Sequence, residues 1–499
     1  MSKNKKMAAG LCLATVLVLG SLPAEAASPI EVVALPGDSP LVSIRLQFNA
    51  GSIYDPAGKE GLAALTALMI AQASTQSRSY TDLLEALYPM AANIGTLTDR
   101  EVVSIGGTVH KDKLAEYTAL LEEALLKPGF SQSDLERNKE QLVATLTNTL
   151  RSNDETLGLE MLQQKIWKGQ PYGHAPKGTV AGLKSITIDD VKKFYQEHYT
   201  QGGLMLGLAG GYPQDYPARL QKDLSALPAG QKGRKALPPV PPVAGRNFTL
   251  IDKETGAVGV HLGFPLPVTR ADADYYPLMV ANSLLGEHRT MHGRLMQQLR
   301  QERGLNYGDY SYIEFYPDPP FTNSPTPGFP RRQQYFSVWV RPVVPADAQF
   351  ALRAALYEVQ RLRDRGLTKE EFELTRDFLL NYTKLWAQSQ DDRLGFLMDS
   401  KFYGMPYFID EIDARLKKMT VDDVNAAIRK YISVDNYDAV LVTANAQQLK
   451  ATLEKDAASP KTYASPPSQA VLEADKTVQA IKVQPSKVEV VPIAEVFEK

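Results

Sequence analysis

Residues 129–139 read GFSQSDLERNK and residues 366–376 read GLTKEEFELTR, so one pattern of glycine, hydroxyl, acidic and apolar residues recurs 237 positions later. In the same way, Thr-Ile-Asp-Asp-Val at 187–191 returns as Thr-Val-Asp-Asp-Val at 420–424. A hydroxyl residue followed by acids is typical of a helix start, because the hydroxyl caps the first turn and the acids face its positive end. Two helix starts repeated at nearly the same offset predict a chain built from two copies of one domain.

Alternating apolar residues predict the strands of each copy. The first copy is expected to contain strands at 41–48 and 102–109, and the second at 258–264 and 336–343. Long amphipathic helices are expected at 59–73, 111–126, 131–150 and 346–365. Strands mixed with helical hairpins in this order predict an α+β fold, with helices packed on one face of each sheet.

Proline-rich and polar segments divide the chain. The stretch 229–246 lacks helical or strand periodicity and contains four prolines between 238 and 242, so it is interpreted as a semi-rigid linker. The predicted organisation is a signal peptide at 1–26, domains at 27–228 and 247–456 on either side of the linker, and a tail at 457–499. Residues 316–330 are expected to form a proline-rich loop. The apolar stretch 488–497 of the tail is expected to dock as a strand.

The first 26 residues have the composition of a secretory signal peptide, with three lysines, an apolar run from 7 to 22, and small residues at Ala24 and Ala26. They predict export to the periplasm. Cys12, the only cysteine, lies in this segment, so a thiol enzyme or a cysteine-ligated zinc protein is excluded for the mature chain. No later segment reaches the roughly 18 apolar residues of a membrane helix, which predicts no membrane insertion after signal removal. The formal net charge of −2 gives no reason to expect a nucleic-acid partner.

The stretch GSIYDPAGKEGLA at 51–63 is similar to the segment that precedes the catalytic helix in pitrilysin/insulinase-family zinc peptidases, which include the mitochondrial processing peptidase. The resemblance implies two duplicated domains of the LuxS/MPP-like fold, each with helices on one face of a mixed β-sheet, in a clamshell arrangement. In active members this helix carries an inverted zinc motif, His-x-x-Glu-His. The two histidines bind the metal, and the glutamate polarises the metal-bound water that attacks the peptide.

In this chain the same helix reads AALTALMI at 63–70 and lacks all three of those side chains. Ala64 and Leu68 stand at the histidine positions and Ala67 at the position of the base, and none of the three can bind a metal or move a proton. The family's third ligand, a glutamate on a later helix, falls at Thr145 by the usual spacing. The resemblance therefore implies a chain that holds no zinc and is not a peptidase by itself.

Only six histidines occur, and none forms a His-x-x-Glu-His or His-Glu-x-x-His motif. His288 and His292 are four residues apart, a spacing that could grip a metal on a helix. They lie between Gly286 and Gly293, where relatives have a glycine-rich turn, so they are expected at a loop surface. Each remaining histidine is isolated and is expected to be hydrogen-bonded or solvated.

Arg300 and Tyr307 match a pair that relatives carry seven residues apart, where a helix ends and a strand begins. The resemblance implies that the pair reaches across the substrate chamber and holds the peptide and the carbonyl oxygen that becomes negative in the transition state. Arginine suits this role because it is always charged and presents a rigid fork of donors. Arg303 and Tyr310 have the same spacing, so spacing alone leaves both pairs open. The Gly-Leu-Asn-Tyr step that ends at Tyr307 matches the family's Gly-Leu-x-Tyr and favours the first pair.

One arrangement in this family places the zinc motif on one chain and the Arg/Tyr pair on its partner. The resemblance thus implies the non-catalytic subunit of a periplasmic heterodimeric metallopeptidase, with peptide substrates and with zinc only in a homologous partner whose motif is intact. Residues 94–98 match the family's edge strand, which pairs with extended peptide through its main chain, although the family's Asn-Ala step is absent there. Two alternatives stay open: a stand-alone peptide-binding or scaffold protein without proteolysis, and an active enzyme with a relocated site.

Overall fold

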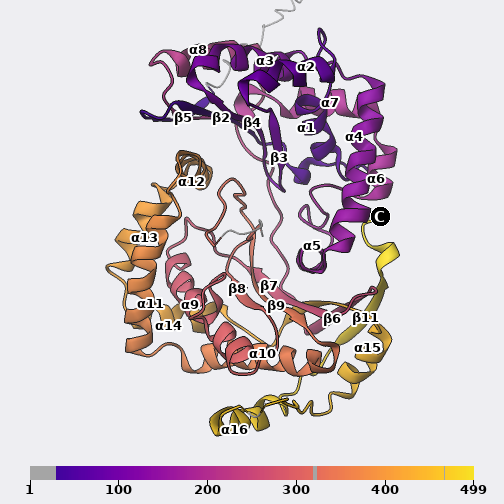
Figure 1. Ribbon diagram of the computed structural model, residues 1–499, viewed down its shortest axis with the longest axis vertical. Coiled ribbons are helices and arrows are strands. Elements are labelled where there is room, and N and C mark those ends of the chain that lie inside the picture. Colours follow the sequence, from indigo (N-terminus) through magenta and orange to yellow (C-terminus); the bar gives the residue numbers. More distant parts are fainter. Residues whose placement is uncertain (1–29, 318–322, 466) are drawn as a thin grey trace, which may run out of the picture.

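The computed structural model describes residues 30–317, 323–465 and 467–499 (Figure 1). The predicted signal peptide with Cys12, and residues 318–322 of the predicted proline-rich loop, lie outside the described residues. Two halves follow one another along the chain, and each consists of one β-sheet with helices packed on it (Figure 1). The predicted α+β fold with two duplicated domains is confirmed.

The first sheet has the strand order β1-β5-β2-β4-β3. Its strands are β1 (Glu31–Pro36), β2 (Leu41–Phe48), β3 (Gly95–Thr98), β4 (Val103–His110) and β5 (Leu204–Gly210). β1 pairs in parallel with β5, and the other neighbours are antiparallel. The strands predicted at 41–48 and 102–109 are confirmed as the antiparallel partners β2 and β4. Alternate side chains of β2 share one face and join residues of the helices in the buried core.

Five of the eight helices described in the first half begin at a residue whose side chain caps the first turn. The eight helices are α1 (Leu62–Ala71), α2 (Tyr80–Leu87), α3 (Leu114–Leu126), α4 (Gln132–Ala144), α5 (Asp154–Ile166), α6 (Val180–Ser185), α7 (Ile188–His198) and α8 (Tyr216–Asp223). A π-helical stretch, η4 (Thr145–Leu150), continues α4. The side chains of Ser131 and Thr187 accept hydrogen bonds from the N–H groups of Asp134 and Asp190, so both predicted helix starts are confirmed.

The second sheet has the strand order β11-β6-β10-β7-β9-β8. Its strands are β6 (Arg246–Asp252), β7 (Val258–Leu266), β8 (Gly308–Tyr312), β9 (Gln334–Val343), β10 (Tyr437–Thr443) and β11 (Lys487–Pro492). β6 pairs in parallel with β10 and β11, and the other pairs are antiparallel. The strands predicted at 258–264 and 336–343 are confirmed as β7 and β9. The tail also docks as predicted, because β11 adds to the edge of this sheet.

The second half repeats the helical pattern of the first. Its helices are α9 (Tyr275–Gly286), a π-helical stretch η7 (Met296–Gln301), α10 (Ala348–Arg365), α11 (Lys369–Tyr382), α12 (Gln390–Tyr403), α13 (Phe408–Leu416), α14 (Val421–Tyr431), α15 (Ala446–Lys455) and α16 (Gln469–Val478). Thr368 and Thr420 form capping boxes at α11 and α14, as their counterparts in the repeat predict. Within the described residues, the helices are too short or too polar to cross a membrane.

The two halves exchange one helix each. α5 of the first half packs against β7 and β10 of the second sheet, and α12 of the second half packs against β1 and β5 of the first sheet (Figure 1). Small residues permit both contacts. A Cβ on Gly158 of α5 would lie 2.2 Å from the His261 ring, and a Cβ on Gly207 of β5 would lie 2.3 Å from the Met398 sulfur. The halves are therefore interlocked rather than merely joined end to end.

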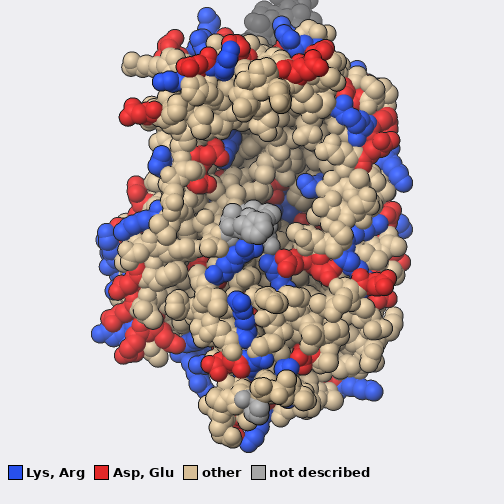
Figure 2. Space-filling view, viewed as in Figure 1, with Lys and Arg blue, Asp and Glu red and all other residues tan. Residues whose placement is uncertain are grey.

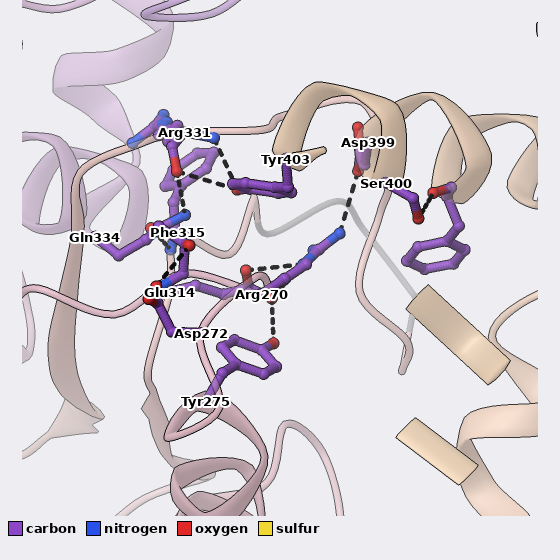
Figure 3. A network of polar contacts seen from close by, with 12 residues as sticks. Arg270, Asp272, Tyr275, Glu314, Phe315, Arg331, Gln334, Asp399, Ser400 and Tyr403 are labelled. Carbon is purple, nitrogen blue, oxygen red and sulfur yellow. Dashed lines mark hydrogen bonds and ion pairs between the residues drawn. The ribbon is translucent and has the colours of Figure 1, made fainter. Parts of the chain in front are cut away.

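Buried ion pairs reinforce this contact between the halves. The fully buried Arg331 makes two hydrogen bonds to Asp99, of 2.6 and 2.7 Å. A second cluster, shown in Figure 3, lies within the second half, where Arg270 contacts Glu314 at 3.0 Å and Asp399 of α12 at 3.2 Å. Removing one partner of a buried ion pair leaves an uncompensated charge. The Arg331–Asp99 pair therefore ties the two halves together, while the Arg270 cluster holds α12, which packs on the first sheet.

Two irregular segments also connect the halves. Residues 228–245 form neither helix nor strand, and Leu237, Val240 and Val243 are half-buried while the prolines between them are exposed. This period of three is typical of a polyproline II segment. At the other end of the chain, the segment after β11 returns to the first half beside α6 (Figure 1), where Val496 and Phe497 are buried in its core.

Candidate functional site

Helix α1, where relatives carry the zinc motif, begins at a fixed place. Gly61 has a positive φ of 104°, a conformation that favours glycine, and precedes the first helical residue. The buried Asp55 carboxylate accepts hydrogen bonds from the N–H groups of Gly61 at 2.8 Å and Ala63 at 2.7 Å. Burial raises the pKa of Asp55, against the opposing effect of the His174 ring at 3.1 Å. Asp55 thus serves as the N-terminal cap of α1.

The histidine positions of the motif lie on the least enclosed side of α1. All ten residues of the helix are buried, and the two with the largest exposed fractions are Ala64 at 5% and Leu68 at 8%. They are one helical turn apart and share one face. Ala67, at the position of the catalytic base, has an exposed fraction of 0%. At these positions the helix presents only hydrocarbon side chains.

Thr145 stands beside the first half of α1. Asn138 of α4 donates to the Gln72 carbonyl and Asp134 accepts from Ser74, both just past the C-terminal end of α1, so the two helices run antiparallel. Thr145 follows Asn138 by about two helical turns and therefore lies toward the start of α1. Its hydroxyl donates to the Gln141 carbonyl at 2.8 Å.

These residues do not fit zinc. Alanine and leucine side chains have no lone pair to give a metal, and the Thr145 hydroxyl already has a hydrogen-bond partner. Among the described residues, histidine, cysteine, aspartate and glutamate side chains nowhere gather in groups of three or more that could hold a metal ion.

Arg300 and Tyr307 are brought together at the surface of the second half. Arg300 lies at the end of η7, and the chain turns at Gly304, whose φ is +61° and whose N–H donates to the Arg300 carbonyl at 2.8 Å. After this turn Tyr307 is 74% exposed, and its ring centroid lies 5.8 Å from the Arg300 guanidinium carbon. Within the described part of the chain, no carboxylate lies within ion-pair distance of Arg300.

The side chains of the alternative pair, Arg303 and Tyr310, are buried and contact other residues of the fold. Arg303 is 6% exposed and donates to the Asp475 carboxylate at 2.8 Å and to the Gln298 carbonyl at 2.7 Å. Tyr310 is 7% exposed on β8 and packs against the His288 ring at 4.8 Å. Of the two pairs, only Arg300 and Tyr307 are accessible to a ligand or a partner.

The histidines correct two expectations. His288 lies in a turn, as expected, but it is 1% exposed and its Nδ1 is 2.6 Å from the Tyr312 hydroxyl, so the predicted surface position is wrong. Tyr310, Tyr312 and Tyr316 surround the ring and bury it. His261 is also buried, and its ring nitrogens have no hydrogen-bond partner among the described residues, contrary to expectation. Burial lowers the pKa of His261 to about 3.

An open groove runs beside the edge strand of the first sheet. The segment predicted at 94–98 is confirmed as edge strand β3, which pairs with β4 alone within the sheet. A groove of about 500 Å³ is lined by β3, β4, Arg45 and residues 326–329. Figure 2 shows the molecule hollowed between its two halves. An extended chain placed at β3 would find main-chain groups available for pairing.

One polar residue beside Tyr307 escaped sequence analysis. Asp309 lies within β8 and has an exposed fraction of 0%. The one feature in the sequence that could have pointed to Asp309 is its position two residues after the candidate Tyr307. The sequence alone does not reveal that β8 is buried on both faces.

Comparison with known families decides the identity. Residues 32–179 match the family model described as insulinase, peptidase family M16, and residues 185–379 match the model described as peptidase M16 inactive domain. The chain belongs to peptidase family M16. This is the pitrilysin/insulinase family that residues 51–63 resemble, so the predicted family is confirmed. The second matched model is the inactive domain of the family, and the chain contains no His-x-x-Glu-His motif, which together mark it as an inactive M16 member.

Several M16 proteins are similar over most of the chain. It is 24% identical to the non-peptidase homolog YmxG of Helicobacter pylori, over 81% of this chain and 89% of that protein. It is 23% identical to the mitochondrial-processing peptidase subunit beta of Caenorhabditis elegans, over 53% and 58%. The crystal structure of a peptidase M16 inactive domain from Pseudomonas fluorescens has a TM-score of 0.73 at 22% identity, covering 83% of this chain and 95% of that one. A protease from Helicobacter pylori has a TM-score of 0.68 at 16% identity, covering 83% and 97%. Both structures share the fold.

Proposed function

We propose that this M16 chain is the non-catalytic subunit of a periplasmic, two-chain zinc metallopeptidase. Its partner is a homologous subunit with an intact zinc motif, which holds the metal and the catalytic base. This chain closes the chamber, binds the peptide substrate and supplies Arg300 and Tyr307 to the partner's zinc site.

The observation that carries the proposal is the exposed Arg300–Tyr307 pair. Tyr307 is 74% exposed although it is a large aromatic residue, and the Arg300 guanidinium lies 5.8 Å from its ring centroid. Nearby, Arg294 and Arg303 are both paired with carboxylates. A permanent positive charge and a phenol donor facing outward are suited to a peptide carbonyl that becomes negative in the transition state.

Peptide binding is proposed at the groove beside β3. The edge strand offers main-chain donors and acceptors, and the groove beside it is lined by small residues such as Gly106 together with apolar residues such as Ile105 and Phe329. Strand addition of this kind tolerates many side chains, which suits a subunit that holds substrate for another chain to cut.

Mixing the two subunits tests the proposal. The chain should bind no stoichiometric zinc and cleave no peptide alone, and should form a stable complex with an M16 partner that carries His-x-x-Glu-His. The complex should hold zinc only in the partner and should cleave peptides faster than the partner alone. A partner that is equally active without this chain would contradict the proposal, as would zinc bound stoichiometrically to this chain. Fractionation of cells that express the chain with and without residues 1–26 tests the periplasmic location.

A second function, a stand-alone peptide-binding protein, draws support from the same groove. Its volume of about 500 Å³ is formed by one chain without a partner. If this function holds, peptides bind the isolated chain and no M16 partner co-purifies with it. If the subunit function holds, the partner is required for measurable turnover and the two chains elute together.

A further inference from the structure

A buried carboxyl follows the Arg300–Tyr307 pair on β8. Asp309, two residues after Tyr307 on β8, has an exposed fraction of 0%. Its Oδ2 atom has no hydrogen-bond partner among the described residues. A buried carboxyl that is only partly hydrogen-bonded destabilises a fold, so packing alone gives no reason for aspartate at this position.

The strand pairing shows which way Asp309 points. Its partner on β9 is Val340, which belongs to the core of the second half, whereas the next pair along, Tyr310 and Trp339, joins the other core. Since side chains alternate along a strand, Asp309 points to the helical side of the sheet. β8 packs there against η7, the π-helical stretch that contains Arg300.

Asp309 is linked to both members of the exposed pair. The Asn306 side chain donates a hydrogen bond of 2.5 Å to Asp309 Oδ1, and Asn306 immediately precedes Tyr307. The charge of Arg300 also acts on the carboxyl. Burial raises the pKa of Asp309 to about 7, and the Asn306 hydrogen bond and Arg300 only partly oppose this. The carboxyl therefore changes charge near neutral pH.

Arg300 is the charged group that acts on Asp309 among the residues described. From α10, Glu358 faces Arg361, Arg294 and Arg303 instead. Arg341 of β9 extends over the Tyr310 and Trp339 rings, which lie on the opposite face of the sheet. Helix α9, which also packs on β8, contains no charged residue. A change in the charge of Asp309 therefore acts mainly on Arg300 and on Asn306, which lie at the turn between Arg300 and Tyr307.

We propose that Asp309 is a positioning residue: it holds the Asn306 side chain, fixes the turn from Arg300 to Tyr307, and holds it more firmly when ionised. This inference rests on the proposed function for its role in catalysis, but not for its effect on the turn. A hydrogen bond from an amide to a carboxylate is stronger than one to a neutral carboxyl. Because opening of the turn breaks the Asn306 hydrogen bond but leaves the carboxyl buried, the pair is better ordered above neutral pH than below it, although ionisation of Asp309 lowers the stability of the whole fold.

Amide exchange in the isolated chain tests the effect on the turn. The N–H groups of Gly304 and Leu305 are bonded to the carbonyls of Arg300 and Leu299, at 2.8 and 3.0 Å. After correction for the intrinsic pH dependence, their exchange should slow at least about threefold between roughly pH 6 and pH 8. The Asp309→Asn variant should lack this pH-dependent slowing of exchange, which is called the step below. A wild-type chain without the step, or a variant that keeps it, would overturn the proposal.

Two further variants keep the test independent of folding. Asp438→Asn is a matched control, because Asp438 on β10 also accepts from an asparagine, Asn247 at 3.1 Å, and burial also raises its pKa. It should keep the step at Gly304 and Leu305. Asn306→Ala leaves the carboxyl in place but removes its link to the turn, and it should abolish the step as Asp309→Asn does. A step that survives in Asn306→Ala contradicts the proposed link.

The complex with the partner tests the role in catalysis. The pH profile of kcat/KM should show a step near neutral pH that Asp309→Asn removes and Asp438→Asn keeps. A residue with a merely structural role would lower the whole profile without changing its shape, and that result overturns the positioning role. If the complex never turns over peptide, the proposed function fails, while the exchange measurements on the isolated chain still decide whether Asp309 controls the turn.

Discussion

At the scale of single residues, Asp309 should make the stability of the protein depend on pH. Its pKa is about 7 in the folded chain, above the value near 4 expected when unfolded, so the folded state keeps a proton that the unfolded state releases. The contribution of protonated Asp309 to the free energy of unfolding is therefore fully present below about pH 4. It is lost as pH rises to about 7, by up to about 1.4 kcal/mol per pH unit.

Asp309→Asn should remove that dependence. The free energies of unfolding of both proteins should be measured with denaturant at about pH 5 and pH 8. The value for the variant minus that for the wild type should be about 2 kcal/mol larger at the higher pH. If the difference between the two proteins is the same at both pH values, the carboxyl does not titrate as proposed.

The Gly-Leu-Asn-Tyr step favoured the Arg300/Tyr307 pair, but the sequence could not exclude the alternative pair. Arg300/Tyr307 and Arg303/Tyr310 have the same spacing. What excludes the second pair is the ion pair between Arg303 and Asp475, which is 172 residues away in the chain. His288 was misplaced for the same reason, since the tyrosines that bury it follow it on and after β8. Long-range contacts of this kind leave no local pattern.

At the scale of elements, the exchange of α5 and α12 makes a prediction about Gly158. In an exposed helix, glycine to alanine stabilises by up to about 1 kcal/mol. A Cβ at Gly158 would instead lie 2.2 Å from the His261 ring, which is fully buried. Gly158→Ala should therefore destabilise the protein by about 1–3 kcal/mol, measured by denaturant unfolding.

Gly37→Ala is the control for that substitution, because nothing lies within 4 Å of its Cβ position. It should leave the free energy of unfolding nearly unchanged. Stabilisation by Gly158→Ala would show that α5 does not pack against β7 as described.

Many elements could be predicted from periodicity and capping, whereas others, including the central strands β5 and β10, were not. β2, β4, β7 and β9 combine alternation with length, and the repeated Thr caps define α7 and α14. The edge strand β1 was missed because it is short and mostly exposed on one side. The exchange of helices was missed because a helix pattern does not show which sheet it will cover.

At the scale of the whole molecule, the C-terminal segment joins both halves. β11 pairs with β6 in the second sheet, while the Phe497 carbonyl accepts from the Val180 N–H at 2.8 Å in the first half. Arg151 of the first half also donates to the Val496 carbonyl at 3.0 Å. The segment is therefore expected to make the two halves unfold together.

Phe497→Ala should test this expectation. Phe497 is 4% exposed in the core of the first half, and loss of its ring should cost about 3 kcal/mol. Calorimetry should show one transition shifted to lower temperature, and the exposed Glu495→Gln should leave it in place. Two separate transitions in the wild type would contradict a coupled molecule.

The central claim is that this inactive M16 chain lends Arg300 to a partner's zinc site, and the turnover of the complex with Arg300→Ala tests it most directly. Loss of one transition-state donor should lower kcat by roughly 100-fold while the complex elutes unchanged, whereas Arg429→Ala, an exposed arginine on α14, should have no effect. Turnover that is unchanged in Arg300→Ala, with the complex intact, would contradict the account.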